Sequence, residues 1–159
     1  MSYSRVEDRI RMTSQTDDAE SFDFWLTLRL CREVIKVMSE QLSVSVLKKT
    51  QAQHAPMVES FLHAGVASRK TSVRPVTVTP SQTHLLHKIQ VQSGKQSIAL
   101  RLPVNQDTAV LAFKHDEARQ WLAILYKHFQ IAQWPMDIWP EWFNKAMQDT
   151  ESKSEKALH

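Results

Sequence analysis

Glycine is nearly absent from this chain, and this scarcity limits the folds open to it more than any other feature of the sequence. Only two glycines, Gly65 and Gly94, occur among 159 residues. Phosphate-binding loops, dinucleotide-binding turns and the strained turn that presents a catalytic serine all use closely spaced glycines, because a backbone without Cβ atoms turns tightly. No such motif can be written here, so we do not expect a doubly wound nucleotide-binding fold.

The first half of the chain predicts a hairpin followed by two helices. Alternating residues in 5–15 and again at Phe22 and Phe24 predict two strands. Apolar residues then recur at spacings of three and four from Leu28 to Leu42, as on one side of a helix, and Thr27 is placed to be the N-cap. Residues 44–62 predict a second, less regular helix.

The second half predicts a three-stranded meander and a final helix. Alternating apolar residues predict strands over 85–92, 98–102 and 110–113, with short turns between them. Asp116 and Glu117 are then suited to the start of a helix, where negative charge complements the helix dipole. Pro135 is expected to end that helix.

The predicted order is therefore β-β-α-α-β-β-β-α. We expect an α+β fold with one five-stranded, mostly antiparallel sheet and helices packed on one face. A single domain is expected over residues 1–147, including an aromatic segment at 134–143, whereas residues 148–159 are polar and predict a disordered tail. The predicted core comprises Phe22, Phe24, Leu28, Val34, Ile35, Leu100, Trp121, Leu125 and Phe129.

The composition and the single cysteine indicate in which cellular compartment the protein is expected. The apolar fraction of 42% and the charged fraction of 23% are typical of globular proteins. No apolar run is long enough to cross a membrane, and residues 1–8 do not resemble a signal peptide. The single cysteine, Cys31, lies in the inward stripe of the first helix, which predicts a buried thiol in a reducing compartment. We therefore predict a cytoplasmic protein without a membrane partner.

Candidate catalytic and metal-binding groups lack a recognisable spacing. His84 and His87 are three residues apart, so in a strand they point to different faces. A zinc site needs three or four ligands, and the chain offers one cysteine and no His-Glu-x-x-His pattern. The candidate carboxylates all fall in turns or at a helix start, where acidic residues are favoured for local reasons: Asp17, Asp18, Asp107, Asp116 and Glu117. We assign no catalytic residue, no metal ligand and no cofactor, and we do not expect an enzyme.

Charge is distributed unevenly along the chain. Residues 44–114 contain nine Lys or Arg and two acids, a net charge of +7 (9 − 2), while the remainder carries −4 (11 − 15). The positive electrostatic field of residues 44–114 attracts anions. The candidate anion or nucleic-acid contacts are Lys48, Lys49, Arg69, Lys70 and Arg74. The segment lacks the interleaved aromatics on which bases stack, so ordinary solvated lysines and arginines are the alternative explanation.

Four aromatic residues lie within ten residues of the C-terminal region, at Trp134, Trp139, Trp142 and Phe143. Either this segment packs back on the domain, or it presents an apolar patch to another protein. We therefore predict a non-enzymatic binding or assembly module that acts through protein–protein contacts, including self-association. The alternative is a nucleic-acid-binding accessory protein that uses the basic segment.

Overall fold

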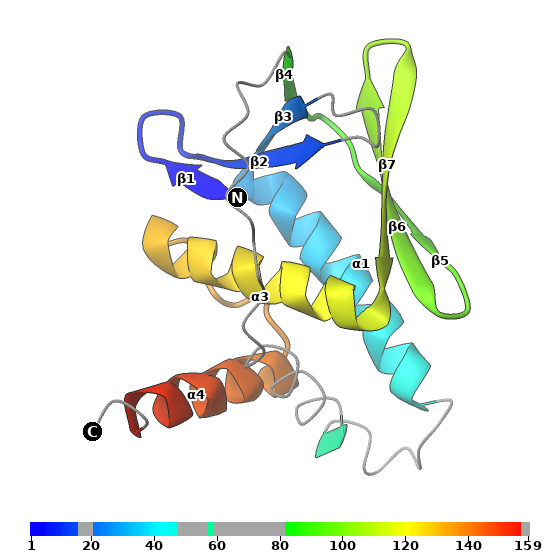
Figure 1. Cartoon of the computed structure of the whole chain (residues 1–159). Helices are drawn as coiled ribbons and strands as arrows, with labels where there is room; N and C mark the ends of the chain where they lie inside the picture. Colours follow the sequence, from blue (N-terminus) through cyan, green and yellow to red (C-terminus); the bar gives the residue numbers. More distant parts are fainter. Residues whose placement is uncertain (16–20, 48–56, 59–81, 157–159) are drawn as a thin grey trace.

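The computed structural model describes residues 1–15, 21–47, 57–58 and 82–156, and it confirms the α+β class. The elements are β1 (Ser2–Ser4), β2 (Arg9–Gln15), β3 (Ser21–Leu26), α1 (Leu28–Leu47), β4 (Gln82–Leu85), β5 (Gln90–Ser93), β6 (Ser97–Val104), β7 (Asp107–Lys114), α3 (His115–Ala132) and α4 (Glu141–Lys156). Among these described elements, three strands precede the helix α1, and four strands and the helices α3 and α4 follow it (Figure 1).

The predicted single five-stranded sheet is wrong, because the described strands form two sheets. Sheet A has the order β1-β2-β3-β4, and sheet B has the order β5-β6-β7. All neighbouring strands are antiparallel except β3 and β4, which are parallel. The helices are also not confined to one face of one sheet, since α3 contacts β1 of sheet A and both β6 and β7 of sheet B.

The break between the two sheets lies inside the predicted strand over residues 85–92. The prediction assumed one constant alternation, with Leu85, Ile89 and Val91 all inward. In the structure Leu86 is buried and Leu85 is 39% exposed, whereas Ile89 and Val91 are half-buried. The inward phase therefore changes between residues 86 and 89, and the chain leaves sheet A and enters sheet B at that point.

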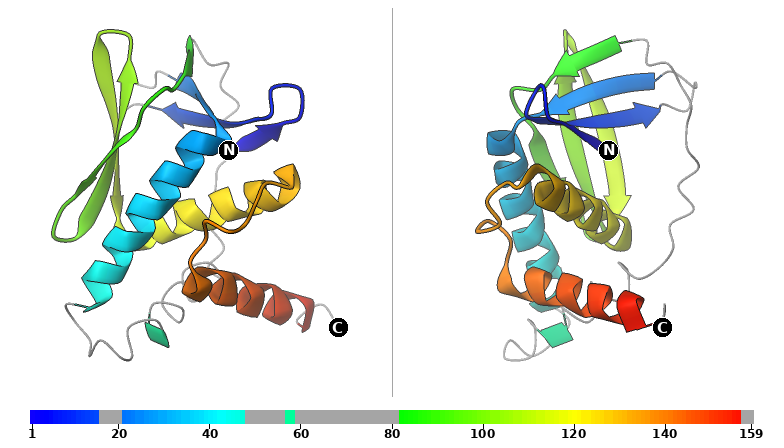
Figure 2. Two further views of the ribbon diagram at one scale, coloured as in Figure 1. Left: turned by 180° about the vertical axis from the view of Figure 1, so that it is seen from behind. Right: turned by 90° about the vertical axis from the view of Figure 1, so that its left-hand side faces the viewer.

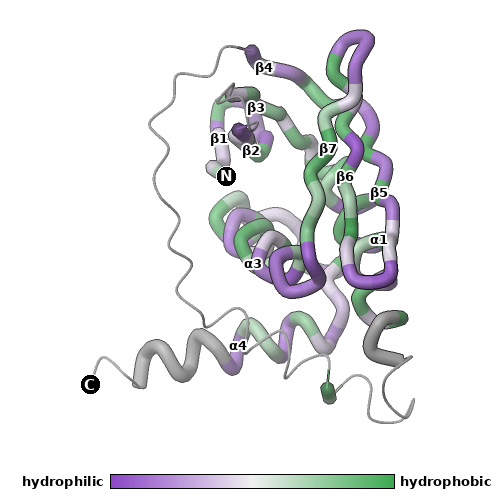
Figure 3. Tube along the Cα trace, turned by 45° about the vertical axis from the view of Figure 1, so that its right-hand side comes forward, coloured by the Kyte–Doolittle hydropathy of each residue, from purple (hydrophilic) through white to green (hydrophobic). Residues whose placement is uncertain are grey.

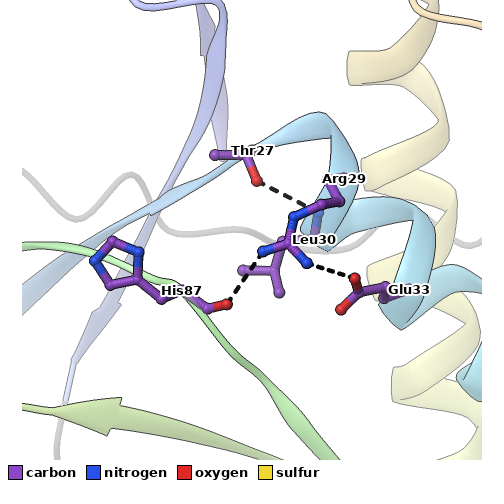
Figure 4. Close-up of polar contacts among 5 residues, drawn as sticks. All are labelled: Thr27, Arg29, Leu30, Glu33 and His87. Carbon is purple, nitrogen blue, oxygen red and sulfur yellow. Dashed lines mark hydrogen bonds and ion pairs between the residues drawn. The ribbon is translucent and has the colours of Figure 1, made fainter.

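Helix α1 holds this crossing segment by a side chain from its first turn. The Arg29 guanidinium donates to the carbonyl oxygen of His87 at 3.3 Å and also pairs with Glu33 at 2.6 Å (Figure 4). Thr27 accepts a hydrogen bond from the backbone N–H of Leu30 at 3.3 Å, so its predicted role as N-cap is confirmed.

The N-terminal hairpin is confirmed, and one strand was missed. β2 and β3 pair antiparallel with Met12 opposite Phe24 and Ile10 opposite Leu26, which places four apolar side chains on one face. β1 adds to the outer side of β2 and is only three residues long. A strand this short shows no alternation, so the pattern of the sequence did not reveal it.

Helix α1 buries the stripe that the sequence predicted. Of that stripe, Cys31, Val34, Ile35, Met38 and Leu42 are buried and Leu28 is half-buried, while Leu30, which was not predicted, is buried as well. The helix extends to Leu47, beyond its predicted end. Most of the predicted second helix over 44–62 lies outside the described residues.

Helix α3 begins and ends by identifiable local interactions. The Glu117 carboxylate accepts from the backbone N–H of Lys114 at 2.7 Å, which satisfies an amide at the helix start. The helix ends at Ala132, because Gln133 adopts a left-handed conformation with φ 56°. Pro135, which was predicted to end the helix, follows two residues later.

The C-terminal residues, predicted to be a disordered tail, are mostly helical in the structure. Helix α4 continues to Lys156, so residues 148–156 are helical. In the views of Figures 1 and 2, α3 lies between the two sheets and α4. The division into a domain over 1–147 and a tail over 148–159 stays a prediction.

The core is one continuous cluster to which both sheets and all three described helices contribute. Seven of the nine residues predicted for it are buried, while Phe22 and Leu28 are half-buried and pack against it. Leu125 on α3 is fully buried and lies within this cluster.

We predict that Leu125→Ala lowers the free energy of unfolding by about 2–5 kcal/mol, because the substitution leaves a cavity in a close-packed core. Urea unfolding followed by circular dichroism measures this loss. Lys127→Ala, at an exposed position of the same helix, is the control and should change stability by no more than about 0.5 kcal/mol. Equal effects of the two substitutions would contradict the assignment of this helix face to the core.

Candidate protein-binding surface

The aromatic segment packs inside the molecule. Trp134, Trp139 and Phe143 are buried, and Trp142 is half-buried. The Trp139 ring lies 4.7 Å from that of Phe143, centroid to centroid, and 5.1 Å from that of Tyr126. These contacts attach the segment before α4, and the first turn of α4, to helix α3. Figure 3 shows hydrophobic and hydrophilic residues following one another along the coloured first part of α4, as expected for a helix with one packed side.

Polar contacts fix the same segment at two further points. The Asp8 carboxylate accepts hydrogen bonds from the Trp134 indole N–H at 2.9 Å and from the Tyr3 hydroxyl at 2.7 Å. These bonds lower the pKa of Asp8, since they favour its charged form. Arg32 on α1 binds Asp137 through two bonds of 2.6 and 2.7 Å. This pair lowers the pKa of Asp137.

The four aromatic residues therefore have an internal structural role. Trp134, Trp139 and Phe143 could reach another protein only if the segment left the core. A role for the four as an external interface stays untested, and a binding surface has to be sought among exposed residues.

We predict that Trp139→Ala destabilises the fold by about 3–5 kcal/mol, as large aromatic truncations in a core do. Thermal or urea unfolding measures the effect. Trp139→Phe should cost much less, because the indole N–H of Trp139 has no hydrogen-bond partner among the described residues. Trp142→Ala should also cost less, since that side chain is half-exposed. A Trp139→Ala protein as stable as the native chain would contradict the internal role.

The predicted basic cluster cannot be placed. Lys48, Lys49, Arg69, Lys70 and Arg74 all lie outside the described residues, so whether they form one positive region stays a prediction. Within the described part of the basic segment, four basic side chains are exposed, namely Lys88, Lys95, Arg101 and Lys114. All four belong to sheet B or to the segments that border its strands.

Sheet B has one packed face and one open face. On β6, Ile98, Leu100 and Leu102 are fully buried, and the residues between them point the other way. The strand register then defines the opposite side, which we call the outer face of sheet B. It consists of Gln90, Gln92, Ser97, Ala99, Arg101, Pro103, Thr108, Val110, Ala112 and Lys114, of which all except the half-buried Ala99 are exposed.

The outer face carries few charged residues, and those it carries are positive. None of its ten residues is acidic, two are basic, and four are apolar, with Val110 50% exposed. Arg101 lies on the central strand opposite Gln90 on one side and Val110 on the other. The Arg101 side chain donates to the Gln92 side-chain oxygen at 3.0 Å, which holds the guanidinium across the β5–β6 pair. Few charges around a positioned arginine are typical of the central part of protein interfaces.

The sequence pattern counts Arg101 only as one of the nine basic residues of 44–114 and does not reveal this surface. The signal was available, because the alternation along 98–102 and 110–113 already separates inward from outward positions. What the pattern could not show is which strands are neighbours and whether another element covers the outward side.

Cys31 is excluded as a nucleophile. Its side chain is buried in α1, and burial raises the pKa of the Cys31 thiol to about 12. The reactive form of cysteine is the thiolate, which is then scarce at neutral pH. The predicted burial of this thiol is confirmed.

We predict that a disulfide reagent such as Ellman's reagent labels Cys31 in the native protein at least about 100-fold more slowly than in urea, because both access and thiolate population are low. The absorbance of the released thionitrobenzoate measures both rates, and glutathione under each condition is the control for the reagent. Similar native and unfolded rates would show that Cys31 is accessible.

Neither a metal-binding cluster nor a membrane-spanning helix is found among the described residues. Among those residues, no three His, Cys, Asp or Glu side chains are grouped so that they could hold a metal ion. None of the described helices combines the length and the apolar character needed to cross a membrane.

Comparisons with protein families, curated proteins and solved structures found no match to this chain. Its own geometry is therefore the basis for a functional proposal.

Proposed function

We propose that this chain is a non-enzymatic, cytoplasmic module that binds another protein through the outer face of sheet B. The observation that carries the proposal is the composition of that face. The face is exposed in the described structure, has Arg101 and Val110 side by side at its centre, and carries no acidic residue.

The charge of the face selects the kind of partner. Arg101 and Lys114 have no acidic residue beside them on the face, so an acidic surface of a partner would complete their charge pairing. Apolar contact from Val110, Ala112 and Pro103 would supply the dry centre of such an interface. Single-stranded nucleic acid fits the face less well, because none of its ten residues is aromatic and bases bind by stacking on aromatic rings.

We predict that Arg101→Glu abolishes most partner capture. The chain is immobilised and exposed to lysate of its source cells, with and without nuclease treatment, and the retained proteins are quantified by mass spectrometry. Proteins that bind the face should be depleted about tenfold or more with Arg101→Glu, since reversing a central charge places like charges together. Lys127→Glu, at an exposed position of α3, is the matched control and should retain them.

Two outcomes contradict the proposal. Identical proteins retained by the native chain and by Arg101→Glu would show that the outer face is not the contact surface. Retention that disappears after nuclease treatment, and that falls steeply with added salt, would instead support the nucleic-acid alternative.

A further inference from the structure

The edge of sheet B formed by β7 is the longest strand edge that the described structure leaves open. β7 pairs with β6 along its whole length, and among the described strands it has no neighbour on its other side. The other strands at sheet edges are shorter, with three residues in β1 and four each in β4 and β5, compared with eight in β7.

This edge lacks the features that prevent strands from pairing. Edge strands are usually protected by a charge, a proline or a bulge within the strand. The residues between Asp107 and Lys114 are Thr-Ala-Val-Leu-Ala-Phe, which include neither a charge nor a proline. The register with β6 runs without interruption from Ser97 opposite Lys114 to Val104 opposite Asp107, so the edge contains no bulge.

Apolar side chains near this edge are also incompletely covered. On the inward side, Ala109, Leu111 and Phe113 are only half-buried, whereas their neighbours on β6 are fully buried. On the outer side Val110 is 50% exposed. An added strand would cover apolar surface on both faces of β7 and would pair the backbone groups that point away from β6.

We propose that the β7 edge binds a second copy of this chain, with the two β7 strands antiparallel about a two-fold axis at Leu111. The inference goes beyond the proposed function, because it concerns the edge of sheet B and not its outer face. A two-fold axis perpendicular to the sheet keeps the packed faces of both copies on the same side, so that sheet B continues as one six-stranded sheet.

The side chains of β7 are complementary to themselves in this register. With Leu111 on the axis, Ala109 lies opposite Phe113 and Val110 lies opposite Ala112, so a small side chain meets a larger one at each pair. Lys114 of one copy lies opposite Thr108 of the other and thus beside its Asp107. Each end of the paired strands therefore brings a cation next to an anion, which favours a second copy over an unrelated strand.

The first test is the mass of the chain in solution. Sedimentation velocity and light scattering, from about 1 μM to about 500 μM, should show a concentration-dependent dimer of twice the chain mass. Val110→Lys should weaken dimerisation about tenfold or more, because it places a charge on each strand at the pairing edge. Gln90→Lys puts the same charge on β5, at the opposite edge of the same sheet, and should leave the dimer intact.

The second test reports the register and does not depend on Val110→Lys folding well. Antiparallel partners have Cα atoms about 4.5–5.5 Å apart, within the range of about 4.4–6.8 Å that a disulfide accepts. Leu111→Cys should therefore form an intermolecular disulfide under mild oxidation far faster than Val110→Cys or Ala112→Cys. The native Cys31 is buried and does not compete.

A native chain that is monomeric at every concentration overturns the inference, as does a dimer that Gln90→Lys disrupts and Val110→Lys does not. Fastest cross-linking at residue 110 or 112 overturns the register. These results leave partner capture by the outer face untouched, so failure of the inference and failure of the proposed function are distinguishable.

Discussion

Helix α3 is the element on which the rest of the structure depends, because it must be covered on more than one side. Its buried residues include Leu122, Leu125 and Phe129, and also Tyr126, which lies against the aromatic segment. The sheets cover one side of the helix through contacts with β1, β6 and β7. Trp139 and Phe143 cover another. A helix that is apolar over so wide an arc cannot lie exposed to solvent on all of its remaining sides. The chain therefore folds back after α3, and the aromatic segment packs against the helix.

The return of the chain explains how the N- and C-terminal regions come together. Trp134 packs edge-on against Phe129 and Tyr3 while its indole N–H donates to Asp8, and Arg32 pairs with Asp137 in the same segment. Because these aromatic residues are packed internally, the two proposals rest instead on exposed residues of sheet B. The outer face and the β7 edge share residues of β7, such as Val110 and Ala112. One proposal concerns the side chains of the face and the other the backbone pairing of the edge, so the two can fail independently.

Local features of the sequence predicted much of the secondary structure. The helix α1, the N-cap at Thr27, the acidic start of α3 and the strands β6 and β7 all depend on residues close together in the chain, and each is confirmed. The single sheet was wrong, because Leu85 and Leu86 are both apolar and the alternation does not show where the inward phase changes. The outer face was not recognised as a site, because its ten residues come from three strands and gain a common surface only through pairing.

By itself the sequence determined the α+β class, the inward stripes and the buried Cys31, since hydrophobic periodicity and short-range caps act within a few residues. Only the tertiary structure decided that β3 pairs with β4 in parallel, that the described strands form two sheets, and that Trp134 and Trp139 face inward. Those outcomes depend on contacts between residues such as Asp8 and Trp134, 126 positions apart. Such contacts form only once the chain has closed on itself, and no pattern within a short window of sequence encodes them.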